Sequence, residues 1–115
     1  MKAEESMERV ARYADMFSAM GTEPRLRIIR LLLKAHPNGM VAGALQSELG
    51  IPASTLSHHL QKLKNEGLIN IRRKGTYLWY SSNTQALQEL LTFLYSECCT
   101  RSRAIKPGAI IRLCR

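Results

Sequence analysis

Long apolar runs are absent from this 115-residue chain. No stretch approaches the roughly 20 apolar residues that a membrane-spanning helix needs, and the N-terminal MKAEESMER lacks the apolar core of a signal peptide. We therefore expect a cytoplasmic protein with no membrane partner. Internal repeats, low-complexity tracts and domain linkers are also missing. A chain of this length predicts one compact domain, which we place at residues 1–100, followed by a flexible basic tail at residues 101–115.

Cysteine is scarce, and so are acidic residues. Three cysteines in a reducing compartment do not suggest a disulfide framework, so they are core residues, metal ligands or redox groups. Nine Asp and Glu stand against seventeen Lys and Arg, which gives a formal charge of +8. Five of the nine acids precede residue 24, so the positive charge gathers in the rest of the chain. Such a charge favours nucleic acid or an anionic membrane surface as a partner.

Apolar residues at a spacing of three and four predict a series of amphipathic helices. The first helix includes Met7 and ends at Gly21. The second starts with Thr22 as its N-cap and stops at Pro37-Asn38-Gly39. A short third helix is expected from about Val41 to Leu49, and a last helix begins near Thr84.

Between the third helix and the next one, Gly50-Ile51-Pro52 turns the chain abruptly, and the new helix stops at Gly67. Its leucines lie on one stripe and polar side chains lie on the opposite face. Two short helices across a tight turn predict a helix-turn-helix, although an ordinary solvated face would show the same polarity. The candidate contacts to bases and phosphates on this helix are Ser54, Thr55, Ser57, His58, Gln61, Lys62 and Lys64.

After Gly67 the apolar period changes to two, which predicts a β-hairpin. Its tip combines a turn glycine with three positive charges and would suit a wing along a phosphate backbone. The candidate residues are Arg72, Arg73, Lys74 and Thr76. The expected fold is mainly α with a β-hairpin wing, a winged helix-turn-helix.

Three segments together resemble the ArsR/SmtB family of metalloregulators: MGTEPRLRII at 20–29, STLSHHL at 54–60 and RRKGTYLWY at 72–80. The resemblance covers roughly residues 10 to 98. It implies an α-α-α-α-β-β-α arrangement and a homodimer formed through the first and last helices. It also implies a repressor whose fourth helix enters the major groove of double-stranded operator DNA and which leaves the operator when a metal or metalloid binds.

Two ligand sets of that family are missing from this chain. Members of the family that resemble its best-known arsenic sensor carry a Cys-Val-Cys cluster in the third helix, where this chain has Val41-Ala42-Gly43-Ala44-Leu45. Zinc sensors place Asp, His and Glu ligands on the last helix, and residues 84–97 contain no His. His58 and His59 are adjacent on a helix and point about 100° apart, so we expect His58 to face outward and His59 to be packed and hydrogen-bonded.

The remaining candidate ligands are Cys98 and Cys99 at the end of the last helix, with Cys114 in the tail. Thiolates suit a soft ion such as trivalent arsenic or antimony, and some regulators of the family carry such a C-terminal pair. We expect Arg101 and Arg103 to favour the thiolate form. Cys98 would continue the leucine stripe of the helix, where mere packing would also explain it, whereas Cys99 would be exposed.

The sequence thus predicts a DNA-binding repressor that needs no cofactor for DNA binding and is released by As(III) or Sb(III) as inducer. The alternative is a repressor without metal response, in which Cys98 or Cys99 forms a disulfide with Cys114 as a redox switch. A third hypothesis is a thiol enzyme that uses a histidine as its base. Because the only neighbouring histidines lie on the reading helix and no oxyanion loop is evident, no enzyme activity is expected.

Overall fold

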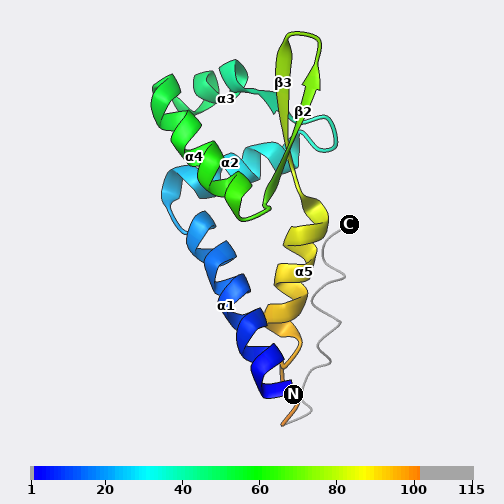
Figure 1. Cartoon of the computed structure of the whole chain (residues 1–115). Helices are drawn as coiled ribbons and strands as arrows, with labels where there is room; N and C mark the ends of the chain where they lie inside the picture. Colours follow the sequence, from blue (N-terminus) through cyan, green and yellow to red (C-terminus); the bar gives the residue numbers. More distant parts are fainter. Residues whose placement is uncertain (1, 102–115) are drawn as a thin grey trace. The chain divides into compact units, whose positions relative to one another are not determined.

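The structure is a computed structural model that describes residues 2–101, with side chains from residue 7 onwards (Figure 1). Its helices are α1 (Lys2–Met20), α2 (Glu23–Lys34), α3 (Ala42–Leu49), α4 (Ala53–Asn65) and α5 (Thr84–Tyr95), and its strands are β1 (Met40–Val41), β2 (Ile69–Lys74) and β3 (Tyr77–Ser82). The chain divides into two compact units between Asn83 and Thr84. The basic tail from residue 102, with Arg103 and Cys114, lies outside the described residues.

The start of α2 is set by local chemistry, as the sequence predicted. Helix α1 ends at Met20, directly before Gly21. The Thr22 hydroxyl oxygen then accepts a hydrogen bond from the Arg25 amide at 3.4 Å, which satisfies one of the free N–H groups at the start of α2. Helix α2 ends at Lys34, three residues before Pro37.

The first unit also contains a three-stranded antiparallel sheet of order β1-β3-β2, whose strand β1 lies between α2 and α3 in the chain. The sequence predicted only the hairpin β2–β3, and Val41, expected to begin the third helix, lies in β1 and pairs with Trp79. Gly39 makes this pairing possible. Its φ is +85°, and a Cβ at this position would overlap the backbone carbonyl of Tyr80. The hairpin extends away from α2, α3 and α4, so its tip is open to solvent (Figure 1).

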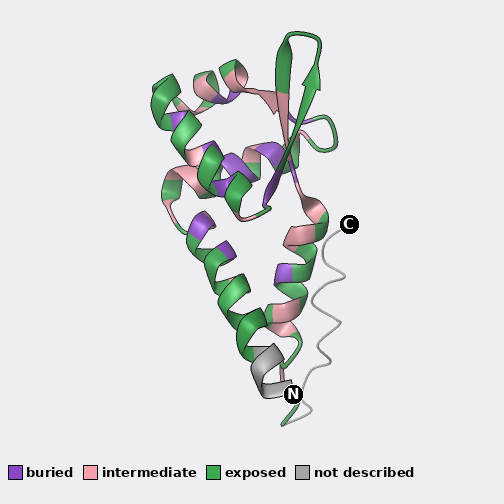
Figure 2. Ribbon diagram, in the orientation of Figure 1, coloured by how far each residue is buried: buried purple, intermediate pink, exposed green. Residues whose placement is uncertain are grey.

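The core of the first unit lies between α2, α3, α4 and the base of the sheet, where the buried residues gather (Figure 2). The predicted leucine stripe of α4 is confirmed, because Leu56, Leu60 and Leu63 are all buried. Burying these side chains while the opposite face stays polar fixes which side of α4 points to solvent.

The second unit contains α5, which begins at Thr84 as predicted. It ends at Tyr95, three residues before Cys98, so the expectation that Cys98 continues the helical stripe is wrong. Residues 96–101 form turns instead, with the Cys98 amide bonded to the Tyr95 carbonyl at 2.9 Å. No helix in the described part of the chain is both long and apolar enough to span a bilayer.

Candidate nucleic-acid interface and thiol pair

Helix α4 presents its polar face to solvent. Gly50 ends α3 in the left-handed conformation with φ +66°, and Pro52 directly precedes α4. This tight turn gives the helix-turn-helix its form. Every candidate on α4 is exposed: Ser54, Thr55, Ser57, His58, Gln61, Lys62 and Lys64. We call this surface the reading face.

An amide pair on α4 was not among the predicted site residues. The Gln61 side-chain nitrogen donates a hydrogen bond to the Asn65 side-chain oxygen at 2.8 Å. The i, i+4 spacing of Gln and Asn is a sequence signal that could have indicated this contact. It holds the Gln61 amide in a defined orientation, with its carbonyl oxygen still able to accept a hydrogen bond.

The two histidines of α4 differ as the sequence predicted. His58 is exposed and His59 is half-buried, with their ring centroids 5.9 Å apart. The pKa of His59 is lowered by burial, then by the positive charges of Arg25 and His58. The expected hydrogen bond is not found at Nδ1, which is buried without a partner in the described structure. His59 therefore sits behind the reading face as a neutral ring.

The hairpin divides its cations between two faces. Cross-strand partners share a face, and Arg72 pairs with Trp79 while Lys74 pairs with Tyr77. Arg73 pairs with Leu78 on the opposite face. All four predicted tip residues, Arg72, Arg73, Lys74 and Thr76, are exposed. The Lys74 ammonium lies 5.9 Å from the Trp79 ring centroid, a cation–π contact that the sequence pattern did not predict.

Cys98 and Cys99 form a close thiol pair in the turn after α5. Their sulfurs are 3.4 Å apart, well beyond the length of a disulfide bond. In a continued helix adjacent side chains would point about 100° apart. Here Cys99 instead has a φ of +58°, a left-handed conformation that is unfavourable for a side chain with a Cβ. The turn therefore holds the pair in contact at some conformational cost.

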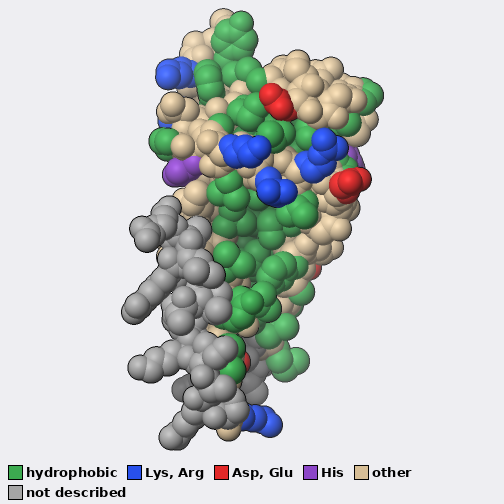
Figure 3. All heavy atoms as spheres, turned by 180° about the vertical axis from the view of Figure 1, so that it is seen from behind, with side chains coloured by type: hydrophobic (Ala, Val, Ile, Leu, Met, Phe, Trp, Pro, Cys, Tyr) green, Lys and Arg blue, Asp and Glu red, His purple; other side chains and the backbone are tan. Residues whose placement is uncertain are grey.

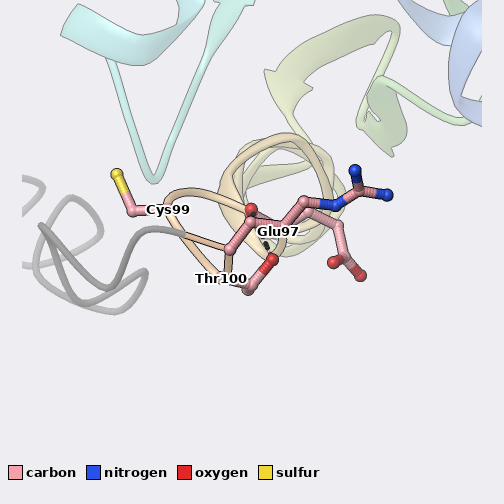
Figure 4. A pocket seen from close by; sticks show the side chains of 4 residues that line it. Glu97, Cys99 and Thr100 are labelled. Atoms are coloured by element: carbon pink, nitrogen blue, oxygen red, sulfur yellow. Dashed lines mark hydrogen bonds between the residues drawn. The ribbon is translucent and has the colours of Figure 1, made fainter.

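A shallow hollow beside this pair is lined by Glu97, Cys99, Thr100 and Arg101. Cys99 points away from the Glu97 and Thr100 side chains, and the Thr100 hydroxyl donates to the Glu97 carbonyl at 3.2 Å (Figure 4). Both cysteines are half-buried, so the expectation of an exposed Cys99 is wrong. The left-handed turn explains the difference, because it folds the two sulfurs together.

The electrostatics of the pair also differ from expectation. The hydrogen bond with Cys99 and then burial raise the pKa of Cys98, so Arg101 does not make this group a thiolate. Among residues 7–101, no three His, Cys, Asp or Glu side chains are grouped as metal ligands. The described residues therefore supply two sulfurs, and Cys114, the third predicted ligand, is outside them.

Comparison with known proteins agrees with this arrangement. The helix-turn-helix domain family matches residues 20–72. The transcriptional activator HlyU of Vibrio cholerae is 34% identical over 100 residues, which cover 84% of this chain and 90% of HlyU. The crystal structure of NolR from Sinorhizobium fredii superposes with a TM-score of 0.65 at 33% identity, over 82% of this chain and 91% of NolR. ArsR2 of Halobacterium salinarum, a putative arsenical resistance operon repressor, is 30% identical over 78 residues, 66% of this chain and 65% of ArsR2.

The fold and the reading face define a winged helix-turn-helix transcriptional regulator, the class of the proteins just compared. The five helices and the antiparallel sheet of residues 2–101 confirm the predicted fold, with β1 added. Within that class, the chain belongs to the ArsR/SmtB family of regulators, as its three sequence motifs indicated.

Proposed function

We propose that the protein is a homodimeric repressor that binds palindromic operator DNA and is released when trivalent arsenic or antimony binds Cys98 and Cys99. The observation that carries the inducer proposal is the 3.4 Å separation of the two sulfurs. Metal–thiolate bonds are about 2.3 Å long in zinc sites, so sulfurs this close can both bond one thiophilic ion.

DNA binding is supported by the exposed reading face and the exposed basic hairpin. Short polar side chains of α4 would meet base edges in the major groove, and the hairpin would lie along the phosphates. The apolar side chains left exposed on α1 and α5, among them Val10 and Leu94, support a dimer formed through these helices. A dimer would present two reading helices to half-sites about one helical turn apart.

The thiol chemistry needs no oxidant. Arsenite, As(OH)3, and two thiols would give As(OH)(SR)2 and two waters, and a third thiol would replace the last hydroxide. The raised pKa of Cys98 fits this exchange, because the thiol protons leave with the departing water. The redox alternative differs in kind, since two thiols form a disulfide only when an oxidant takes two electrons.

Asn83 offers a route from the thiol pair to the reading helix. It directly precedes α5, and its backbone and side-chain N–H groups bond the carbonyls of Leu68 at 2.9 Å and Gly67 at 2.8 Å. Gly67 lies two residues after the end of α4. A shift of α5 on inducer binding would pull on this clamp, with a coupling of about 1 to 3 kcal/mol typical of allosteric systems.

The proposal is tested on a duplex that the protein selects from a random library. Operator release is measured by fluorescence anisotropy with arsenite, antimonite, zinc and hydrogen peroxide in parallel. We expect arsenite or antimonite to weaken binding by about 5- to 150-fold, and a Cys98→Ser/Cys99→Ser variant to bind DNA normally without release. Thr100→Ala alters the same turn but keeps both thiols, so it should respond like the parent.

Each failure points to a different part of the proposal. A protein that selects no duplex refutes the DNA-binding regulator. If the Cys98→Ser/Cys99→Ser variant selects a duplex and arsenite still releases it, only the thiol site is refuted and the DNA-binding regulator stands. Release by peroxide but not by arsenite would establish the redox alternative, and a Cys114→Ser variant would show whether the third cysteine is its partner.

A further inference from the structure

Helix α4 carries a stripe of polar side chains along the middle of its exposed side. At 100° per residue the members of this stripe fall within about 60° of one another, and the buried leucines of α4 lie roughly 130° to 170° from its middle. We name these residues the polar stripe: Ser54, His58, Gln61 and Asn65. All of them are exposed. A partner that contacts α4 from solvent would therefore meet the polar stripe first.

A lysine lies on each side of the polar stripe. Lys62 is roughly 70° around the helix from the middle of the stripe in one direction, and Lys64 is roughly 90° in the other. Both side chains are exposed. Cations at the two edges of a helix suit the phosphates that border the major groove, and the stripe between them then faces the base edges. Gln61 is thus placed to meet a base.

The amide of Gln61 has a defined set of free hydrogen-bonding groups. Glutamine has two N–H donors on its amide nitrogen and an acceptor on its carbonyl oxygen. One N–H donates to the Asn65 side-chain oxygen at 2.8 Å. If the Gln61 amide alone were turned over, its oxygen would lie against the Asn65 oxygen and the bond would be lost. The bond therefore leaves Gln61 with one N–H and one oxygen, a donor beside an acceptor.

Adenine is the base that matches a donor beside an acceptor in the major groove. It presents the acceptor N7 next to its N6 amino donor, whereas guanine presents two acceptors. Cytosine offers its amino donor and thymine its oxygen acceptor, so each could form one bond with the Gln61 amide. Two bonds to a single base edge require adenine.

We propose that Gln61 reads an adenine in each half-site and that Asn65 is its positioning residue. This inference rests on the proposed DNA binding and names the base that one residue of the reading face recognises. A long side chain loses rotamer freedom when a base fixes it, and a bond made before DNA arrives removes part of that cost. Asn65 acts through the Gln61 amide and does not itself contact the adenine.

Base preference tests this role better than affinity does, because cations outside α4 can also attract DNA. Arg27, Arg30 and Lys34 of α2 are exposed. The side of the first unit seen from behind carries Lys and Arg side chains next to hydrophobic ones (Figure 3). Phosphate contacts strengthen binding to every sequence. They cancel in the ratio of two Kd values for duplexes that differ in one base pair, and so does a change in the folded fraction.

The experiment uses the duplex that the parent selects from a random library. Each base pair of one half-site is replaced in turn, and competition anisotropy gives the Kd ratios. Gln61→Ala should lose the preference at one position, and that base should be an adenine that the parent prefers to guanine by about 5- to 150-fold. At that position 7-deazaadenine, which lacks N7, and unsubstituted purine, which lacks the amino group, should each weaken the parent but not Gln61→Ala.

Variants of Asn65 separate positioning from direct contact. Asn65→Ala removes the acceptor and should lower the adenine preference by about twofold or more. Asn65→Asp keeps an acceptor for the Gln61 amide, so it should retain the preference while its negative charge weakens binding to every duplex. Gln85→Ala is the matched control: it breaks a Gln–Glu89 bond of the same i, i+4 spacing on α5 and should leave every preference unchanged.

The outcomes that overturn the inference differ from those that overturn the proposed function. Unchanged preferences in Gln61→Ala, or the loss of a preference for another base, refute the reading role of Gln61. An undiminished adenine preference in Asn65→Ala, or its loss in Asn65→Asp, refutes the positioning role. In each case a parent that selects a duplex remains a DNA-binding regulator, whereas a parent that selects none refutes both.

Discussion

At the scale of single residues, His59 links the stability of the reading helix to pH. Burial, followed by the charges of Arg25 and His58, lowers its pKa below the ordinary value of about 6.5. At pH values between the lowered pKa of His59 in the folded protein and its ordinary pKa, this side chain binds more protons in the unfolded chain than in the folded one. The free energy of unfolding therefore falls as pH drops below about 6.5, and this loss is absent above it.

We expect a His59→Gln variant to lose part of this acid sensitivity, because glutamine does not titrate. Urea unfolding at pH 7.5, 6.5 and 5.5 measures the free energy at each pH. His36→Gln is the control, since its side chain is exposed and it is not among the groups that act on His59. Equal pH slopes in the parent and the His59 variant would contradict the assignment.

Gly39 is the second residue whose environment makes a firm prediction. Alanine at this position would need a φ of +85° and would place its Cβ against the Tyr80 carbonyl. We expect Gly39→Ala to lower the free energy of unfolding by about 2 kcal/mol or more, through strain and loss of the β1–β3 pairing. Gly43→Ala is the control, because a Cβ there meets nothing within 4 Å. Thermal unfolding compares the two, and equal losses would argue against the close approach.

At the scale of elements, the hairpin presents two chemically different faces. Arg72 and Lys74 share a face with Trp79 and Tyr77, whereas Arg73 shares the other with Leu78. The contact between Lys74 and the Trp79 ring reduces the freedom of the ammonium group. The face with two cations should therefore make more contacts with backbone phosphates than the face on which a single cation lies beside an aliphatic side chain.

Replacing Arg72 and Lys74 by Ala should therefore weaken operator binding more than replacing Arg73 does. Each lost phosphate contact makes the slope of log K against log salt shallower by about 1. The slope of the double variant should therefore be shallower than the parent's by about 2. Anisotropy titrations from about 50 to about 200 mM salt, a range over which such effects are large, give both slopes. A larger loss for Arg73→Ala would show that the opposite face meets DNA.

At the scale of the whole molecule, a dimer that holds its two reading helices at a fixed separation should bind an operator with an affinity that depends on the distance between the half-sites. Adding about 5 bp to the centre of the selected operator turns one half-site to the opposite side of the duplex. We expect affinity to fall toward that of a single half-site, and adding about 10 bp to restore part of it. Electrophoretic mobility shifts with the three duplexes make the comparison, and indifference to spacing would contradict a rigid dimer.

The helices, the hairpin and the reading face could be predicted from the sequence, because they depend on local signals. The leucine period of α4, the Thr22 cap and the turn at Gly50 act over a few residues and need no distant partner. The exposed candidates on α4 followed from that period alone.

Features that join residues without a periodic signal between them could not be predicted in this way, because they depend on the tertiary fold. The two-residue strand β1 exists through its pairing with β3, and the Asn83 clamp through carbonyls fifteen and sixteen residues earlier in the chain. The cation–π contact depends on the strand register. The contact between Cys98 and Cys99 arises because α5 ends at Tyr95 and Cys99 turns left-handed, where helical periodicity would have separated the sulfurs. A local pattern specifies which face of an element is apolar, but the end of a helix and the approach of distant backbones depend on packing and hydrogen bonds across the fold.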